Sequence, residues 1–140
     1  MDFLASFKIC SSGLSAQRAK MDVITSNLAN METTKTREGG PYRRKKVVFA
    51  AAPLQGGFGG LLDKALSQVK VEKVVAEEGV RLIFDPQHPD ADERGMVAKP
   101  DVNLMEEMVE MLAASRNFEA CVTAFDATKS MALKAMDIGK

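Results

Sequence analysis

Apolar residues recur at alternating spacings of four and three at both ends of this chain, and this repeat limits the possible folds more than any other feature. The N-terminal series is Phe3, Phe7, Cys10, Leu14, Met21, Ile24, Leu28 and Met31, with the polar Gln17 between Leu14 and Met21. The C-terminal series is Leu104, Met108, Met111, Phe118, Val122, Phe125, Ala132 and Met136, with the polar Ser115 and Lys129 at the remaining positions of the repeat. Such spacing is typical of long helices that pack side by side.

The ends of the two predicted helices are marked by residues that start or stop helices. Residues 1–33 contain no proline, and the loop-forming stretch around Gly39 follows them. Residues 101–140 begin directly after Pro100, and Asn103 is a suitable N-cap residue for the helix that follows. We therefore predict a helix in each of these two segments.

Residues 34–100 are predicted to form loops and a small β region. Residues 44–49 end in Val-Val-Phe, and residues 69–84 contain two apolar runs separated by Glu-Glu-Gly, which predicts a β-hairpin. Residues 96–99 could add a short strand, and four glycines within residues 56–60 indicate a linker. The predicted class is α+β: a coiled-coil-like pair of terminal helices with a small β domain inserted between them.

This β region is too short to cover both helices, so we expect their apolar residues to contact each other or other chains. The distribution of charge points the same way. Residues 1–46 carry nine Lys and Arg against four Asp and Glu, whereas residues 72–119 carry five against twelve. A basic end and an acidic stretch favour head-to-tail contact between copies over binding to nucleic acid or to a membrane surface. The periodicity alone leaves a monomeric helical hairpin open.

Two clusters invite a chemical interpretation. His88 lies among Asp85, Asp90 and Asp92, which could bind a metal or serve acid–base chemistry, but the spacing matches no calcium loop and also suits a rigid turn. Residues 43–46 are all basic and could bind phosphate, or could be a solvated charge run beside a strand. We predict no catalytic, cofactor or metal site, and we expect the chain not to be an enzyme.

The two cysteines and the N-terminus indicate in which cellular compartment the chain is expected to act. In an antiparallel helix pair Cys10 would lie about one turn from Cys121, so a disulfide is conceivable, but two buried free thiols are favoured. The N-terminus lacks the features of a cleaved signal peptide, which by itself indicates the cytoplasm.

Several stretches resemble bacterial flagellar rod and hook proteins. Residues 12–17 (SGLSAQ) and 25–30 (TSNLAN) are similar to the N-terminal signature of that family. Residues 40–45 (GPYRRK), 85–91 (DPQHPDA) and 114–120 (ASRNFEA) are similar to segments of one member. The resemblance covers nearly the whole chain.

The resemblance implies a structural subunit of the proximal rod of the flagellar basal body. It implies terminal helices packed around the export channel, torque transmission, and export without a cleaved signal through the flagellar type III apparatus to the periplasmic rod. The implied partners are further copies, FlgB- and FlgF-type rod subunits and a FliE-type base adaptor, with no nucleic acid, membrane insertion or cofactor. Another axial subunit of the family and a small soluble helical hairpin are the alternatives.

The predicted assembly interface combines the apolar repeats with the signature residues. Gln17, the polar break in the first repeat, falls within the signature and is expected to contact another subunit. The full set is Phe3, Phe7, Leu14, Gln17, Met21, Ile24, Asn27, Leu28, Asn30, Met108, Met111, Ser115, Arg116, Phe118, Val122, Phe125 and Met136.

Overall fold

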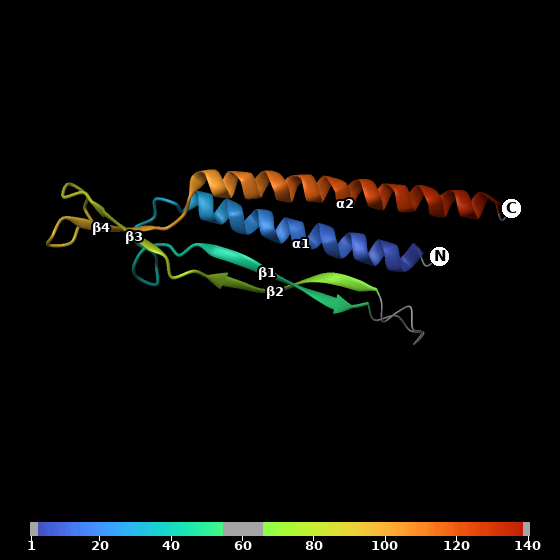
Figure 1. Cartoon of the computed structure of the whole chain (residues 1–140), viewed down its shortest axis with the longest axis horizontal. Coiled ribbons are helices and arrows are strands. Elements are labelled where there is room, and N and C mark those ends of the chain that lie inside the picture. The colour runs from blue at the N-terminus through green and yellow to red at the C-terminus, as the bar shows by residue number, and fades with distance from the viewer. Residues whose placement is uncertain (1–2, 55–65, 139–140) are drawn as a thin grey trace.

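Two long antiparallel helices run along most of the molecule in a computed structural model that describes residues 3–54 and 66–138 (Figure 1). Helix α1 spans Phe3–Ala29 and helix α2 spans Leu104–Ile138. Asn103 is the N-cap of α2, because its side-chain Oδ1 accepts a hydrogen bond from the backbone N of Met105 at 3.0 Å. Helix α1 ends before the predicted boundary at residue 33. The glycine-containing loop draws the chain away there, and the backbone N of Tyr42 donates to the Thr33 carbonyl at 3.0 Å.

The β region consists of two separate antiparallel pairs of strands. Strand β1 (Lys45–Pro53) pairs with β2 (Ser67–Ala76), and β3 (Val80–Phe84) pairs with β4 (Met96–Pro100). The predicted hairpin at residues 69–84 is therefore wrong, although strands lie in both halves of that segment.

The reason lies in the segment between β2 and β3, which continues the first pair instead of turning back. The backbone N of Glu77 donates to the Arg44 carbonyl at 2.8 Å, and the Glu77 carboxylate lies 2.6 Å from Lys46 Nζ. Gly79 does not adopt the positive φ that a tight turn with glycine would use. The Glu-Glu-Gly segment thus connects two β pairs. The glycines at 56–60 lie outside the described residues.

The β1–β2 ribbon lies along α1, so that α1 is sandwiched between this ribbon and α2 (Figure 1). The backbone N of Val69 in β2 donates to Ser12 Oγ of α1 at 3.2 Å. Among the described helices and strands, α2 packs only against α1. The β region therefore covers one helix and leaves most of the other uncovered.

The β3–β4 hairpin projects from the opposite end of the molecule to the two chain termini (Figure 1). Its loop closes through a hydrogen bond from the Asp85 backbone N to the Gly95 carbonyl at 2.9 Å, and Gly95 has a φ of 71°. Thr34 Oγ1 donates to Asp90 Oδ2 at 2.7 Å, which ties the loop to the segment after α1.

The core is thin, and three of its four members on the two helices are alanines. Its buried apolar members are Ala5, Ala16, Ile24, Tyr42, Leu54, Val97, Val102 and Ala114. Small residues let helix backbones approach closely but remove little apolar area from water. Neither described helix has an apolar stretch long enough to cross a membrane.

Candidate assembly interface

The face of α2 that packs on α1 is rotated relative to the predicted one. Most of its half-buried and buried residues again follow alternating steps of four and three: Glu107, Met111, Ala114, Phe118, Cys121, Phe125, Thr128 and Ala132. Glu110 and Ser115 are also half-buried. Every second position agrees with the predicted repeat, and the others lie one residue earlier in the chain. Met108 and Val122 therefore turn outward, while Glu107 and Cys121 face α1.

Two contacts fix the register of the helix pair. The rings of Phe7 and Phe125 pack with centroids 4.9 Å apart and planes inclined by 59°. Farther along, a Cβ atom on Gly13 would lie only 3.2 Å from Cys121 Sγ, so the helices approach closely at this glycine. Cys10 and Cys121 are both free thiols.

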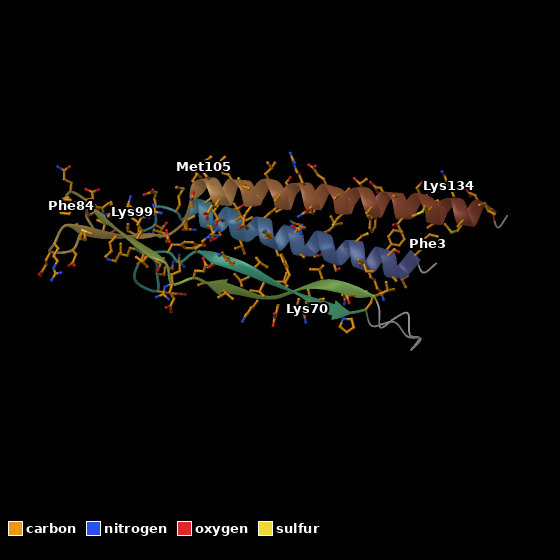
Figure 2. All side chains as sticks on the ribbon, in the orientation of Figure 1. Phe3, Lys70, Phe84, Lys99, Met105 and Lys134 are labelled. Carbon is orange, nitrogen blue, oxygen red and sulfur yellow. The ribbon has the colours of Figure 1, made fainter. Side chains whose placement is uncertain are left out.

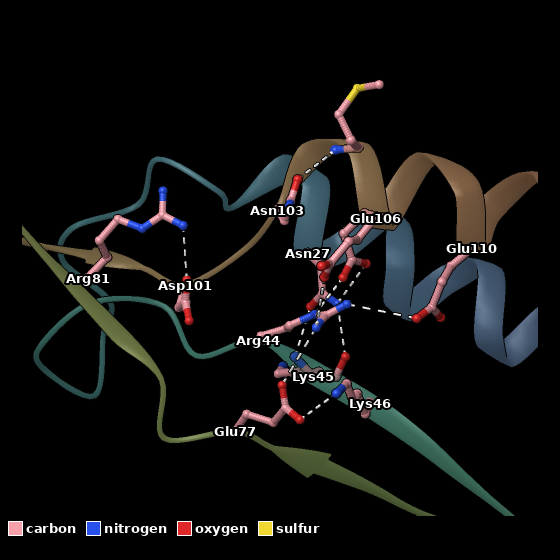
Figure 3. A network of polar contacts seen from close by, with 12 residues as sticks. Asn27, Arg44, Lys45, Lys46, Glu77, Arg81, Asp101, Asn103, Glu106 and Glu110 are labelled. Atoms are coloured by element: carbon pink, nitrogen blue, oxygen red, sulfur yellow. Dashed lines mark hydrogen bonds and ion pairs between the residues drawn. The ribbon is translucent and has the colours of Figure 1, made fainter.

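A buried polar network joins α1, the start of β1 and α2; we call it the Asn27 network, and it consists of Asn27, Tyr42, Arg44, Lys45 and Glu107. Figure 3 labels Asn27, Arg44 and Lys45 where these elements meet. Asn27 Nδ2 donates to Glu107 Oε2 at 3.1 Å and to the Lys45 carbonyl at 2.9 Å. Asn27 Oδ1 accepts from the Lys45 backbone N and from the Tyr42 hydroxyl, each at 2.9 Å. All four hydrogen-bonding positions of this amide are therefore satisfied inside the chain.

Arg44 completes the network by neutralising Glu107. Arg44 Nε donates to Glu107 Oε1 at 2.6 Å, and the Glu107 side chain is almost fully buried. Glu77, Glu106 and Glu110 also lie within 4 Å of the guanidinium, at 3.8, 3.7 and 3.9 Å. Burial works to lower the pKa of Arg44, but its hydrogen bond to Glu107 and the charges of Glu107, Glu77 and Glu110 raise that pKa above its ordinary value.

Two residues of the basic run at 43–46, Arg44 and Lys46, thus form ion pairs within the chain. Arg44 and Lys46 contact carboxylates of the β2–β3 connection and of α2, whereas the neighbouring Arg43 is exposed and lies 3.9 Å from Glu78. The pairing of Arg44 with Glu107 was not predicted from the sequence. The opposite charges of residues 43–46 and 106–110 are the signal that could have indicated it.

Gln17 has a different environment from Asn27. Its Oε1 is buried, and within the described part of the chain it has no hydrogen-bond partner. A buried acceptor without a partner costs roughly 1–3 kcal/mol. The role of Gln17 as a contact between subunits stays a prediction, and this unsatisfied oxygen is compatible with it.

The outer face of α2 exposes large apolar side chains near both ends of the helix (Figure 2). We call the group in its first turns the outer stripe: Met105, Met108, Val109 and Leu112, which are 67%, 52%, 66% and 56% exposed. Apolar area that has no cover within the described chain is typical of a surface that another chain covers.

The predicted interface residues fall into three groups in the structure. Ile24 and Asn27 are buried within the chain, and Met108, Arg116, Val122 and Met136 are exposed. The half-buried members are Phe3, Phe7, Leu14, Gln17, Met21, Leu28, Asn30, Met111, Ser115, Phe118 and Phe125. Asn30 bonds locally to the Ser26 carbonyl at 2.9 Å and receives a hydrogen bond from Thr33.

The His88 loop is held by hydrogen bonds to its own backbone. Asp90 N donates to His88 Nδ1 at 3.1 Å, and Gln87 N donates to Asp85 Oδ1 at 3.3 Å. Within residues 3–54 and 66–138, no group of three or more His, Cys, Asp or Glu side chains is arranged to hold a metal ion. The rigid-turn interpretation accounts for these contacts.

Family models match the N-terminal and the C-terminal segment of the chain, and known proteins are similar to it over nearly its whole length. A family model described as "Flagella basal body rod protein" matches residues 7–35, and one described as "Flagellar basal body rod FlgEFG protein C-terminal" matches residues 93–138. The chain is 41% identical to the flagellar basal-body rod protein FlgC of Bacillus subtilis, with 96% of this chain and 97% of that protein aligned. It is 40% identical to FlgC of Borreliella burgdorferi, over 99% and 98% of the two chains. It is 37% identical to FlgC of Yersinia enterocolitica over the full length of both.

Proposed function

Since this chain belongs to the FlgC family of flagellar basal-body rod proteins and is a structural subunit of that rod, we propose that its terminal helices build the proximal rod. The observation that carries the proposal is the outer stripe on α2. A helix that packs on one side only, with exposed Met and Val on the other, needs further chains to cover it.

The proposed division of the chain follows from this packing. Residues 1–33 and 101–140, which contain α1 and α2, form the rod core, and residues 34–100 form a small domain attached to it. The Asn27 network supports this division, because it fixes the β region to the helix pair where the two meet. In the assembled rod the helices would surround the export channel and transmit torque over many contacts.

The proposed neighbours are other copies, FlgB- and FlgF-type rod subunits and a FliE-type adaptor at the base. We place the rod in the periplasm, reached without a cleaved signal through the flagellar type III export apparatus. The thin core supports passage as an unfolded chain, because little apolar burial opposes unfolding and the remaining apolar surface is covered on assembly. A structural role of this kind requires no catalysis.

The proposal is tested by placing a charge on the outer stripe in a strain that lacks the natural gene. Val109→Asp should leave the chain folded and exported, since the side chain is 66% exposed and has no internal role. It should nevertheless prevent incorporation into basal bodies and abolish swimming, because the carboxylate would be buried between subunits.

Asn117→Asp is the matched control, since it adds the same charge at an exposed polar position of the same helix. It should swim normally. Immunoblots of the culture fluid and of purified basal bodies separate an export defect from an assembly defect. Normal incorporation of the Val109→Asp chain would contradict the proposal.

A further inference from the structure

The four residues of the basic run at 43–46 have two different environments. Arg44 and Lys46 pair with carboxylates of the same chain (Figure 3). Arg43 and Lys45 instead line a pocket beside the loop that follows α1. We propose that this pocket docks an acidic segment of a different protein of the basal body. This inference rests on the proposed function, and it names the chemistry of one partner.

The pocket has a volume of about 590 Å³ and is lined mainly by cations. Arg37, Arg43 and Lys45 contribute three positive charges against one negative charge from Glu38, a formal balance of +2, and all four residues are exposed. We call it the basic pocket. Glu78 lies 3.9 Å from Arg43, but the two side chains are 90% and 58% exposed, so this ion pair contributes little. The cations are therefore available to a partner.

Tyr42 gives the basic pocket a fixed aromatic wall. This residue is buried, and its hydroxyl donates to Asn27 Oδ1 at 2.9 Å, which holds the ring in place. Lys45 Nζ lies 5.7 Å from the ring centroid, within the range of a cation–π contact. Ala76, the β2 residue opposite Lys45, also lines the pocket, and its small side chain leaves room beside the lysine. Cations around a rigid apolar surface suit a peptide that carries both carboxylates and apolar side chains.

A phosphate or a nucleic acid fits the basic pocket less well. Phosphate sites typically use backbone N–H groups that point at the anion. Here the backbone N of Gly39 donates to the Thr36 carbonyl at 3.1 Å, and that of Thr36 donates to the Gly40 carbonyl at 2.9 Å. These donors are used within the loop, and Glu38 would repel a ligand that is negative throughout. Carboxylates spaced along a peptide can reach the cations and avoid Glu38.

The acidic loop at residues 85–95 of a second copy is a poorer ligand than a segment of a different protein. Asp85 Oδ1, Asp90 Oδ2 and Asp92 Oδ1 each accept a hydrogen bond within the chain, at 3.3, 2.7 and 2.8 Å. Moving one of these carboxylates to a cation of another copy would cost that hydrogen bond, which offsets part of the gain. Glu93 is the only other carboxylate in the loop sequence. The docked segment is therefore assigned to a different polypeptide.

The first test treats purified basal bodies with a carbodiimide, which joins a lysine amine to a carboxylate in contact with it. We expect mass spectrometry to find an amide between Lys45 and an Asp or Glu of a different polypeptide. Lys46 is the internal control, because its Nζ lies 2.6 Å from Glu77 Oε1 and the two should be joined in the same sample. In a Lys45→Arg chain the amide to the other polypeptide should disappear, and the link from Lys46 to Glu77 should stay.

The second test reverses charge in the basic pocket. The double variant Arg37→Glu, Arg43→Glu should be exported and keep the urea midpoint of the purified chain, since both residues are exposed. Its amount in basal bodies should fall about tenfold, because two attractive contacts become repulsive. The matched control is Lys70→Glu, Lys73→Glu, which makes the same change of charge at exposed positions of β2 and should be incorporated normally.

Three outcomes would overturn the inference. Lys45 could be joined to no other polypeptide although Lys46 is joined to Glu77, Lys45 could be joined only to a second copy of this chain, or the two double variants could be incorporated equally. Finding the unaltered chain in basal bodies without the Lys45 amide refutes this contact alone. Its absence from basal bodies refutes the proposed function.

Discussion

Removing the Arg44 guanidinium should destabilise the fold more than any exposed charge change. Arg44→Met keeps much of the aliphatic packing but leaves the Glu107 carboxylate buried without its cation. Breaking a buried ion pair from one side costs about 3–5 kcal/mol. Asn27 still donates to Glu107 at 3.1 Å, and the Arg44 side chain is 13% exposed, so we expect the lower end, about 3 kcal/mol. Most small domains have only about 5–15 kcal/mol of stability, so this loss would be large.

Two further variants separate the contribution of the Arg44–Glu107 ion pair from the general effect of losing an arginine. Arg43→Met removes the same group from the adjacent residue, whose side chain is 58% exposed, and should change stability by less than about 0.5 kcal/mol. The double variant Arg44→Met, Glu107→Leu removes both charges and should recover about 2 kcal/mol of the loss.

The assay is urea unfolding of the purified full chain, followed by far-UV circular dichroism at one fixed low concentration. Because the pKa of Arg44 is raised in the folded chain, its contribution is fully present below its ordinary pKa and is lost only as the pH rises through the raised pKa. The effect of Arg44→Met should therefore not shrink between neutral and mildly alkaline pH. Equal losses for the two arginine variants, or strict additivity in the double variant, would refute the reasoning.

Three further outcomes follow from the helix pair. Gln17→Leu should raise the stability of the isolated chain by about 1 kcal/mol in urea unfolding, because it removes an unsatisfied buried acceptor, yet it should weaken rod assembly. An unchanged number of assembled rods would argue against a subunit contact. Gly13→Val should cost about 1–3 kcal/mol in the same measurement, since its Cβ would press on Cys121 Sγ. Mass spectrometry of non-reduced subunits from native rods should find free thiols at Cys10 and Cys121, and a mass lower by two hydrogens would show a disulfide instead.

The helices and the strand segments could be predicted because each has a local cause. The heptad spacing identifies both helices, Asn103 caps the second in the way its position suggests, and residues 80–84 and 96–100 are strands. Strand pairing has no such local cause. The segment Glu77–Gly79 looks like a turn, but ion pairs with Lys46 and Arg44 hold it extended, and those partners are distant in sequence.

Which face of α2 packs on α1 also could not be predicted from the apolar pattern, because it depends on residues that are distant in sequence. Met108 is the more apolar residue, yet Glu107 faces the partner helix because Asn27 and Arg44 together satisfy its carboxylate. Apolar periodicity assumes that a helix buries its most apolar side. Here a polar network selects the neighbouring face, and the displaced apolar residues become the outer stripe.

The hydrogen bond between Asn27 and Glu107 joins residues separated by 80 positions in the chain. A contact of such long sequence separation forms late, because a large loop must close first. At a synthesis rate of about 5–20 residues per second, Glu107 in the first turn of α2 would follow Asn27 by about 4–16 s, and the rest of α2 would follow later. During that interval the face of α1 that packs on α2 has no partner helix. The nascent chain therefore has no stable fold until its last quarter has been synthesised, which leaves time for a binding factor to capture the N-terminal segment before the helices can pair.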